Sequence, residues 1–387
     1  MIEPLLARIR AESAAEAAAA KGRPAAQLAV HDWSTLHFAH DSKADRMTLT
    51  HASDVGYDLK TTLIVRARDG EPIAPAEVAL RTADAVHTTR AGDAPAPVCH
   101  IDQLLDAMNH ARDLDLGPAT LVHVVDREAD SIGHWRAWAA ADHIALVRGD
   151  DRRVLYGGVE TSLTAIAAEL KSCGRFRDAG AAKFHGRPAR RFVAEAEVVL
   201  HKPAKRNTGE KTAGGHKKKE EVPGPPLTLR LVVCELRSDK PGSPTLARWL
   251  LLTNAPPELA DAATIAEWYY FRWNIEDMHK LLKSAGWELE GWLQRDGLKI
   301  FHKLLLALAA CASIWELKRR NDGEAEEFRR LLMTLSGRQT KRARPVTVSG
   351  LLAGLWVLQA SLGSLARYGP GQLQAMLEAN LPLFAGP

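Results

Sequence analysis

The chain has 387 residues, of which 46% are hydrophobic and 25% are charged, the proportions of a globular protein with a sizeable core. Its formal net charge of +4 permits a polyanionic partner without requiring one. The four cysteines, at positions 99, 173, 234 and 311, form no CxxC pair, so a zinc or dithiol site of that kind is excluded and a reducing cytoplasm is the simplest setting. The N-terminus contains acids and lacks the apolar core of a signal peptide, and the longest apolar run, 304–315, is too short to span a bilayer.

The N-terminal half of the chain alternates strand-like and helix-like segments. Residues 1–27 predict an alanine-rich helix and a linker. Strands are predicted over 28–39, 57–67, 75–84, 119–126 and 143–149, and helices over 101–114 and 131–142. The run at 119–126 is continuously apolar and ends in an acid, as expected of a strand buried on both faces. This order predicts an α/β fold with a mixed sheet.

The middle of the chain, 151–257, is mostly β in character, with paired strands predicted at 190–202 and 227–238. Between them, residues 202–219 hold seven Lys or Arg residues against a single Glu. We expect a solvated basic loop there, which could equally serve as a contact for phosphates that reads no sequence. From 291 onward the pattern predicts helices only.

The stretch "WYYFRWNIEDMHKLLK", 268–283, separates at helical pitch into an apolar face and a polar stripe. The stripe holds Tyr269, Arg272, Glu276, His279, Lys280 and Lys283. Thr264 followed by Glu267 predicts a capping box at the helix start. Taken alone, the stripe indicates an ordinary amphipathic surface helix with an i,i+4 ion pair. It indicates a catalytic site only if other carboxylates lie close to Glu276 in the fold.

Two further acids qualify because they lie in or directly after apolar strands. Asp32 lies inside the first predicted strand, in "AVHDWST", and Asp126 closes the strand "LVHVVD". With Glu276 they form a candidate trio of hard oxygen ligands suited to Mg²⁺ or Mn²⁺. Two such ions can hold the attacking and leaving oxygens of a phosphodiester displacement. The neighbouring basic residues would then bind DNA phosphates.

These residues resemble a known family. Tyr269, Arg272, Glu276 and Lys283 have the spacing of the Y-R-E-K signature of the DDE transposases of the insertion-sequence-four group, the Tn-five transposase-like enzymes. "VVDREAD" resembles the second-aspartate motif of that group, and "HDWST" is similar to its first. The resemblance covers roughly 28–300, and the C-terminal helices only loosely.

The resemblance implies an RNase H-like mixed-sheet core with a β-rich insertion and a C-terminal helical region. The domains expected from it are an N-terminal helix and linker (1–27), the first segment of the RNase H-like core (28–150), the β insertion (151–257), a core helix carrying Glu276 (258–290), and a helical region with a possible role in dimerisation (291–387). Family members usually carry an end-recognition domain before the first aspartate. Only 31 residues precede Asp32, so that domain is expected to be missing here.

The resemblance also implies residue roles and a reaction. Asp32, Asp126 and Glu276 would be catalytic and would hold two Mg²⁺ or Mn²⁺ ions, and DNA would be bound by Tyr269, Arg272, Lys283, Lys280, Arg148 and Trp249. Trp249 would stack on a flipped base, although a core tryptophan is an equal alternative. The enzyme would be a cut-and-paste DNA transposase. It would hydrolyse and transfer strands at transposon ends through a DNA hairpin.

The partners implied are the inverted-repeat ends and target DNA, bound by a homodimer in a bacterial, nucleoid-associated cytoplasmic setting, with no membrane. Two alternatives stay open at this point. One is a shortened, non-catalytic inhibitor that dimerises with full-length transposase. The other is a structural α/β protein whose acids never meet.

Overall fold

The computed structural model describes residues 2–22, 24–38, 43–49, 51, 53–91, 103–184, 186–211, 217–238, 244–285, 287–338 and 346–380. The chain divides into two compact units, which are described separately below. The first comprises Met1–Met278 and Leu293–Phe301, and the second comprises His279–Trp292 and His302–Pro387.

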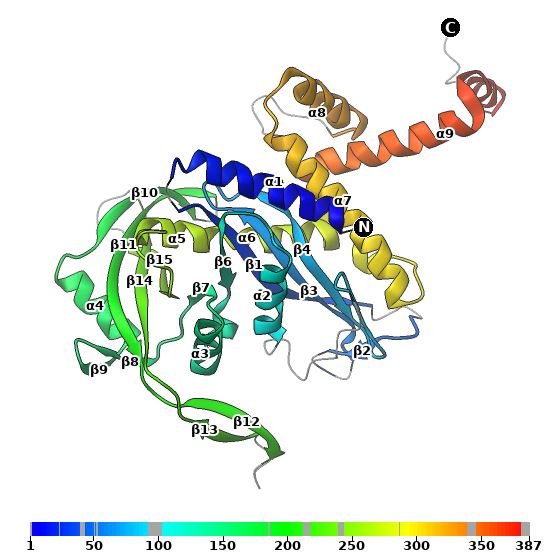
Figure 1. The fold of residues 1–387 in the computed structure, drawn as a ribbon. Coiled ribbons are helices and arrows are strands. Elements are labelled where there is room, and N and C mark those ends of the chain that lie inside the picture. The colour runs from blue at the N-terminus through cyan, green and yellow to red at the C-terminus, as the bar shows by residue number, and fades with distance from the viewer. Residues whose placement is uncertain are drawn as a thin grey trace. The chain divides into compact units, whose positions relative to one another are not determined.

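Thirteen strands of the described residues form one mixed sheet, which belongs to the first unit (Figure 1). Their bounds are β1 Ala26–His37, β2 Met47–Thr48, β3 Val55–Arg66, β4 Pro72–Arg81, β5 Val86–Thr88, β6 Thr120–Val125, β7 Ile144–Arg148, β8 Arg153–Tyr156, β9 Val159–Ser162, β10 Arg177–Phe184, β11 Arg187–Leu200, β14 Leu227–Arg237 and β15 Thr245–Thr253. The strand order is β5-β4-β3-β1-β6-β7-β15-β14-β11-β8-β9, with β10 beside β11 and β2 beside β3. The expected mixed α/β sheet is thereby confirmed.

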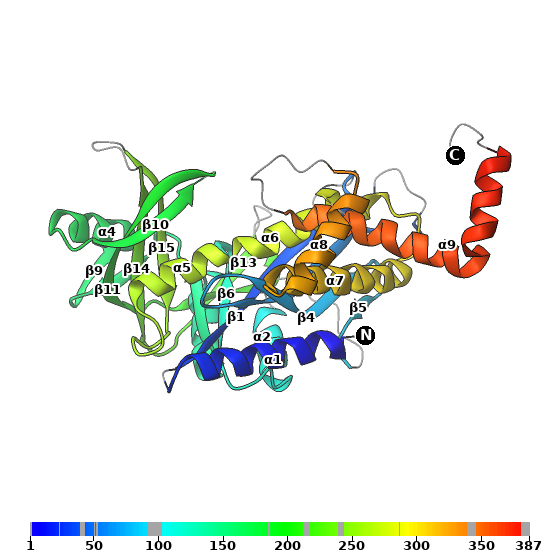
Figure 2. The same ribbon diagram turned by 90° about the horizontal axis from the view of Figure 1, so that it is seen from above.

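The helices of the first unit are α1 Glu3–Ala19, α2 Leu104–Asp113, α3 Ile132–Ala140, α4 Leu163–Ser172, α5 Ala262–Phe271 and most of α6 Trp273–Lys280. In Figure 2, α1 and α2 lie on one face of the β1–β4–β6 part of the sheet, and α5 and α6 lie on the other. The first six residues of β1 and the last four of β6 are all buried, as expected where both faces of a sheet are covered.

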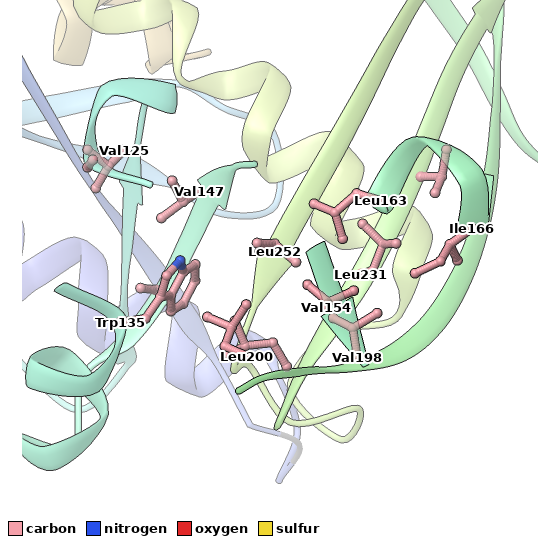
Figure 3. Packing of buried hydrophobic residues seen from close by; sticks show 14 of the residues in the cluster. Val125, Trp135, Val147, Val154, Leu163, Ile166, Val198, Leu200, Leu231 and Leu252 are labelled. Carbon is pink, nitrogen blue, oxygen red and sulfur yellow. The ribbon is translucent and has the colours of Figure 1, made fainter. Parts of the chain in front are cut away.

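One apolar core joins the central sheet to the β insertion. Helix α3 contributes Trp135 and Trp138, both completely buried, beside Val125 of β6 and Val147 of β7. Figure 3 follows the same cluster outward to Leu231 and to side chains of α4. Helix α4 was not expected inside a mostly β segment. Its Ser162 cap and its apolar positions at three- and four-residue steps explain why it forms.

The basic segment 202–219 differs from the expected loop, because much of it forms a two-stranded ribbon. Strand β12 Ala204–Lys211 pairs antiparallel with β13 Lys217–Val222. Cross-strand Lys–Glu pairing, such as Lys205 opposite Glu221, offsets the charge and supports the pairing. At its base, Arg136 of α3 donates to the carbonyls of both Lys202 and Pro225, 2.9 Å each, which ties the ribbon to the core.

The second unit is helical, as the pattern beyond 291 predicts. It contains a π-turn at Leu281–Ala285, a 3-10 turn at Leu289–Gly291, most of α7 Gly297–Arg319, α8 Gly323–Leu335 and α9 Val348–Asn380. Gly354 of α9 allows close approach to α8, because a Cβ there would lie 1.8 Å from the Leu332 carbonyl oxygen. Helix α9 kinks at Gly369, where Pro370 follows.

By length and composition alone, α7 and the part Val348–Leu377 of α9 could cross a membrane. Such helices are weak evidence for a membrane, because a buried core helix passes the same test. The most apolar window of α7 is indeed more than half buried, in keeping with the buried helix expected at 304–315.

Candidate carboxylate site

The register of two parallel strands brings the first two predicted acids level with each other. Strands β1 and β6 pair in parallel as far as Val30 opposite Val124. Two residues further along each strand are Asp32 and Asp126. Both side chains therefore leave the same face of the sheet, on adjacent strands. Asp126 keeps an extended backbone with ψ 174° as it begins the 3-10 turn Arg127–Ala129, so this alternation continues through it.

The third acid comes from the helix pair over that face. The segment expected as one helix is divided at Arg272 into α5 and α6, and its true N-cap is Asp261, whose carboxylate accepts from the backbone N–H of Thr264. The capping box expected at Thr264 is therefore wrong by one turn. Although the helix is divided, Tyr269, Arg272 and Glu276, which are three and four residues apart in the sequence, still lie together.

The junction between α5 and α6 is anchored to the turn between β3 and β4. Gly70 has a φ of 74°, and a Cβ there would lie 2.3 Å from the ring of Phe271. The side-chain amide of Asn274 donates to the Gly70 carbonyl over 2.8 Å, and the indole of Trp268 donates to the Ala67 carbonyl over 3.1 Å. These contacts on both sides of Arg272 hold its backbone in place.

Two polar contacts then connect the helix pair with the acids. The hydroxyl of Tyr269 donates to Asp126 Oδ1 over 3.1 Å, and Arg272 Nη2 donates to Glu276 Oε1 over 2.6 Å. Burial acts to lower the pKa of Arg272, but the negative charges of its neighbours, including Asp126 and Glu276, outweigh burial and raise it. Arg272 thus lies as a buried cation among the carboxylates.

Asp32 completes the group electrostatically. Burial raises the pKa of its carboxyl to about 6, and the charges that act on it are Arg272, Glu276 and Asp126. Its Oδ1 accepts from the backbone N–H of Trp33 over 2.9 Å. The three acids, 244 positions apart from first to last, therefore share one electrostatic environment with Arg272 as the common cation.

Two of the other predicted DNA-binding residues border this group. Arg148 at the end of β7 acts electrostatically on Tyr269, and its guanidinium has no ion-pair partner in the described part of the chain. Trp249 of β15 is only 8% exposed, and its ring lies 5.8 Å from that of Tyr269, so it packs as a core tryptophan in this conformation. Its stacking on a base remains a prediction.

Lys280 and Lys283 belong to the second unit. Lys280 is exposed, and Lys283 Nζ lies 3.7 Å from Glu290 Oε1 within that unit.

Sequence reasoning missed two groups. Asp130, four residues after Asp126, is buried and accepts from Trp135 Nε1, from the backbone N–H of Asp150 and from Arg152 Nη2. It ties the loop after β6 to the loop after β7. Both aspartates of "DREAD" were visible in the sequence, but only the contacts separate the site acid Asp126 from the structural acid Asp130.

The second missed group lies on the opposite face of the sheet. His31 precedes Asp32, and its Nε2 lies 2.9 Å from His123 Nδ1, while the His123 ring meets that of His143 edge-on. Burial lowers the pKa of all three histidines, that of His123 to about 3. They form a neutral buried row. The repeated His residues before the strand acids were a signal in the sequence.

The acidic side chains of the site are of the chemical type that binds divalent cations. They are three carboxylates, and Asp126 Oδ2 and Glu276 Oε2 have no hydrogen-bond partner among the described residues. Arg272 Nε is also buried without a partner. The side chains do not surround a single point, however. Within the described ranges, no group of three or more His, Cys, Asp or Glu side chains has the geometry to hold a metal ion.

No protein-family model matches the chain, and no curated protein matches it. Among solved structures, the chain is similar to one chain of a cryo-electron microscopy structure of the piggyBac transposase synaptic complex with hairpin DNA, at a TM-score of 0.37 and 10% identity. The match covers 89% of this chain and 54% of the other, so the chain spans about half the length of that structure's chain. A likeness this distant decides nothing about function, which therefore has to be inferred from the carboxylate site.

Proposed function

We propose that the chain is the catalytic core of a DDE transposase, a metal-dependent enzyme that cuts and transfers DNA strands. The observation that carries the proposal is the convergence of Asp32, Asp126 and Glu276 around the buried guanidinium of Arg272. Structural acids are normally separated and individually paired, as Asp130 is with Arg152. Three acids that share one arginine instead form a site with excess negative charge.

The sheet supports an RNase H-like core. Strand β1 is antiparallel to β3, and β3 is antiparallel to β4, whereas β6 and β7 follow β1 in parallel. This arrangement places the ends of two parallel strands next to each other, one of them carrying Asp126, beneath the helix pair that carries Glu276. The β insertion is continuous with the sheet through the pairing of β15 with β7.

Asp32, Asp126 and Glu276 would hold Mg²⁺ or Mn²⁺. Two bound ions would supply an activated water or 3′-hydroxyl and stabilisation of the leaving oxygen. Tyr269 fixes one oxygen of Asp126 and leaves the other open. Burial penalises charge on Asp32, and a cation would relieve that penalty. The open oxygens and the penalty on Asp32 favour a metal in the chemistry of the donors, although the side chains as placed form no metal-holding group among the described residues.

Arg272 and Arg148 would bind DNA phosphates near the acids. The buried Nε of Arg272 has no hydrogen-bond partner among the described residues, and a charge-assisted hydrogen bond is strong in a buried position. Arg148 supplies a second guanidinium on the Tyr269 side of the site. Lys280, Lys283 and Trp249 are proposed as further DNA contacts on the resemblance alone. The family resemblance is also the basis for four further proposals. These are strand transfer through a hairpin, action on inverted-repeat ends and target DNA, a homodimeric complex, and a bacterial cytoplasmic location.

The test is nicking of supercoiled plasmid by the purified chain with Mg²⁺ or Mn²⁺, read as open circles on a gel. We expect nicking that EDTA, Asp126→Asn and Glu276→Gln abolish. Asp113→Asn is the matched control, because Asp113 is an exposed acid paired with Arg112. Equal nicking by all variants would refute the site. DNA binding by the wild-type chain without nicking would refute the catalytic proposal and favour the inhibitor alternative.

A further inference from the structure

A second group of charges lies on the β insertion, on the sheet face that α4 covers. Glu235 of β14 is directly opposite Phe192 of β11 and Arg248 of β15, so these three side chains leave the same face. Trp249 follows Arg248 and leaves the other face, where its ring contacts Tyr269. The group around Glu235 therefore lies on the opposite face of the insertion sheet from Tyr269.

Three cations share the single carboxylate of Glu235, which is completely buried. Lys171 Nζ, near the end of α4, donates to both carboxylate oxygens over 3.2 Å. Arg237 donates to Oε2 through its Nε and Nη2 groups, over 3.0 and 2.8 Å. Arg248 donates to Oε1 through the same two groups, over 3.0 and 2.7 Å. The three cationic groups are therefore held beside one another.

One carboxylate balances only one of these three positive charges. Burial raises the pKa of Glu235, but the three cations outweigh burial and lower it, so the carboxylate is ionised at neutral pH. None of the three cations pairs with another acid in the part of the chain that the structure describes. Neutralising Glu235 would need a single cation, and each further one adds like-charge repulsion. The group thus keeps positive charge in excess, which a second anion would balance.

The group is held on one side and open to solvent on the other. The Arg237 guanidinium lies over the rings of Phe192 and Phe176, 4.3 and 5.3 Å from their centres, which fixes its plane. The side chains of Lys171, Arg237 and Arg248 remain 46%, 29% and 35% exposed. Within the described residues, neither arginine donates a hydrogen bond through Nη1. Guanidinium and ammonium donors of this kind bind the oxygens of phosphate groups.

We infer that Lys171, Arg237 and Arg248 form a phosphate-binding site on the β insertion. Glu235 positions the three cations, and the bound phosphate balances their excess charge. The phosphate group belongs either to the DNA backbone or to a free phosphate compound. This inference goes beyond the proposed function, because it needs neither a metal nor the three acids of the carboxylate site.

The experiment measures thermal unfolding of the full chain during a titration with sodium phosphate, compared with sodium chloride of equal ionic strength. Phosphate should raise the melting temperature of wild type above its value in chloride, because a ligand that binds only the folded state stabilises it. Lys171→Met and Arg248→Gln should each bind phosphate about tenfold more weakly and lose most of this difference. Glu235 keeps two cations in either variant, so both variants should fold.

Lys299→Met is the matched control, because Lys299 pairs one to one with Asp296 on the surface, over 2.7 Å. It should retain the full wild-type difference between phosphate and chloride. The control also contains the general stabilising effect of phosphate ions, which does not depend on a binding site.

Fluorescence anisotropy with a short DNA duplex, over a series of salt concentrations, identifies the source of the phosphate group. If DNA supplies it, Lys171→Met also reduces the slope of log affinity against log salt by about one. If that slope is unaltered while Lys171→Met loses the effect of inorganic phosphate, the ligand is a free phosphate compound.

Two results would overturn the inference. One is equal stabilisation of wild type by phosphate and by chloride. The other is the full wild-type difference in both Lys171→Met and Arg248→Gln. Neither result bears on the carboxylate site, which is tested by plasmid nicking, so the two proposals can fail independently.

Discussion

Tyr269 donates a hydrogen bond from its phenol to Asp126 Oδ1 over 3.1 Å, and so joins residues 143 positions apart in the chain. This contact connects the helix pair with the end of β6. Asp126 Oδ1 also accepts from the backbone N–H of Arg127 over 2.7 Å. With both bonds in place, one carboxylate oxygen is fixed and the other is presented to the site.

We expect Tyr269→Phe to lower the rate of plasmid nicking about tenfold, because the removed bond, worth about 1–1.5 kcal/mol, holds Asp126 in orientation. The ring contact with Trp249 is kept by phenylalanine, so thermal stability should change little. Rates and melting temperatures measured on the same preparations check this. A rate equal to that of wild type would show that Asp126 needs no support from Tyr269.

Arg272→Ala should weaken binding to double-stranded DNA and reduce the slope of log affinity against log salt by about one. The reason is that a phosphate contact releases counterions, whereas an interaction internal to the protein does not. Binding is measured by fluorescence anisotropy over a series of salt concentrations. Arg330→Ala is the control, since Arg330 forms an exposed i,i+4 pair with Glu326. An unaltered slope in Arg272→Ala would argue against a phosphate contact there.

The two aspartates of "DREAD" should behave in opposite ways. Asp130→Ala removes one partner of a buried ion pair with Arg152 and should lower the free energy of unfolding by about 3 kcal/mol. Asp126→Asn keeps the acceptor oxygen and should change that free energy by less than about 1 kcal/mol while it abolishes nicking. Urea unfolding monitored by circular dichroism measures both. Comparable destabilisation by the two variants would contradict the division into a structural and a site acid.

The buried histidine row predicts loss of stability in mild acid. Burial, together with the neighbouring histidines and Lys60, lowers the pKa of His31 below its value in the unfolded chain, and burial and His143 lower that of His123 to about 3. The unfolded state therefore binds more protons once the pH falls below about 6.5. The free energy of unfolding should fall with decreasing pH below that value, by at most about 1.4 kcal/mol per pH unit for each histidine.

Urea unfolding at pH 7.5, 6.5 and 5.5, values chosen to bracket the usual histidine pKa of about 6.5, tests this dependence. The double variant His31→Asn/His123→Asn should be less stable than wild type at neutral pH. Its free energy of unfolding should fall less than that of wild type between the highest and the lowest of these pH values. A variant with the full pH dependence of wild type would show that other groups cause it.

Local patterning was sufficient to predict most of the elements and the candidate acids. The runs at 28–39, 57–67 and 119–126 became β1, β3 and β6, because periodicity and β-branched content are properties of the segment itself. The same is true of the polar stripe that carries Tyr269, Arg272 and Glu276. Acids at the end of an apolar strand are visible in the sequence without knowledge of what lies beside them.

Only the tertiary structure decided which of these residues meet. The register that sets Asp32 level with Asp126 and opposite Thr61 depends on pairing between strands far apart in the chain, and a shift of one residue would turn each side chain to the other face. The structural role of Asp130 likewise depends on the loop after β7. Such contacts cannot be read from the sequence directly, because they form between segments that become neighbours only when the sheet assembles.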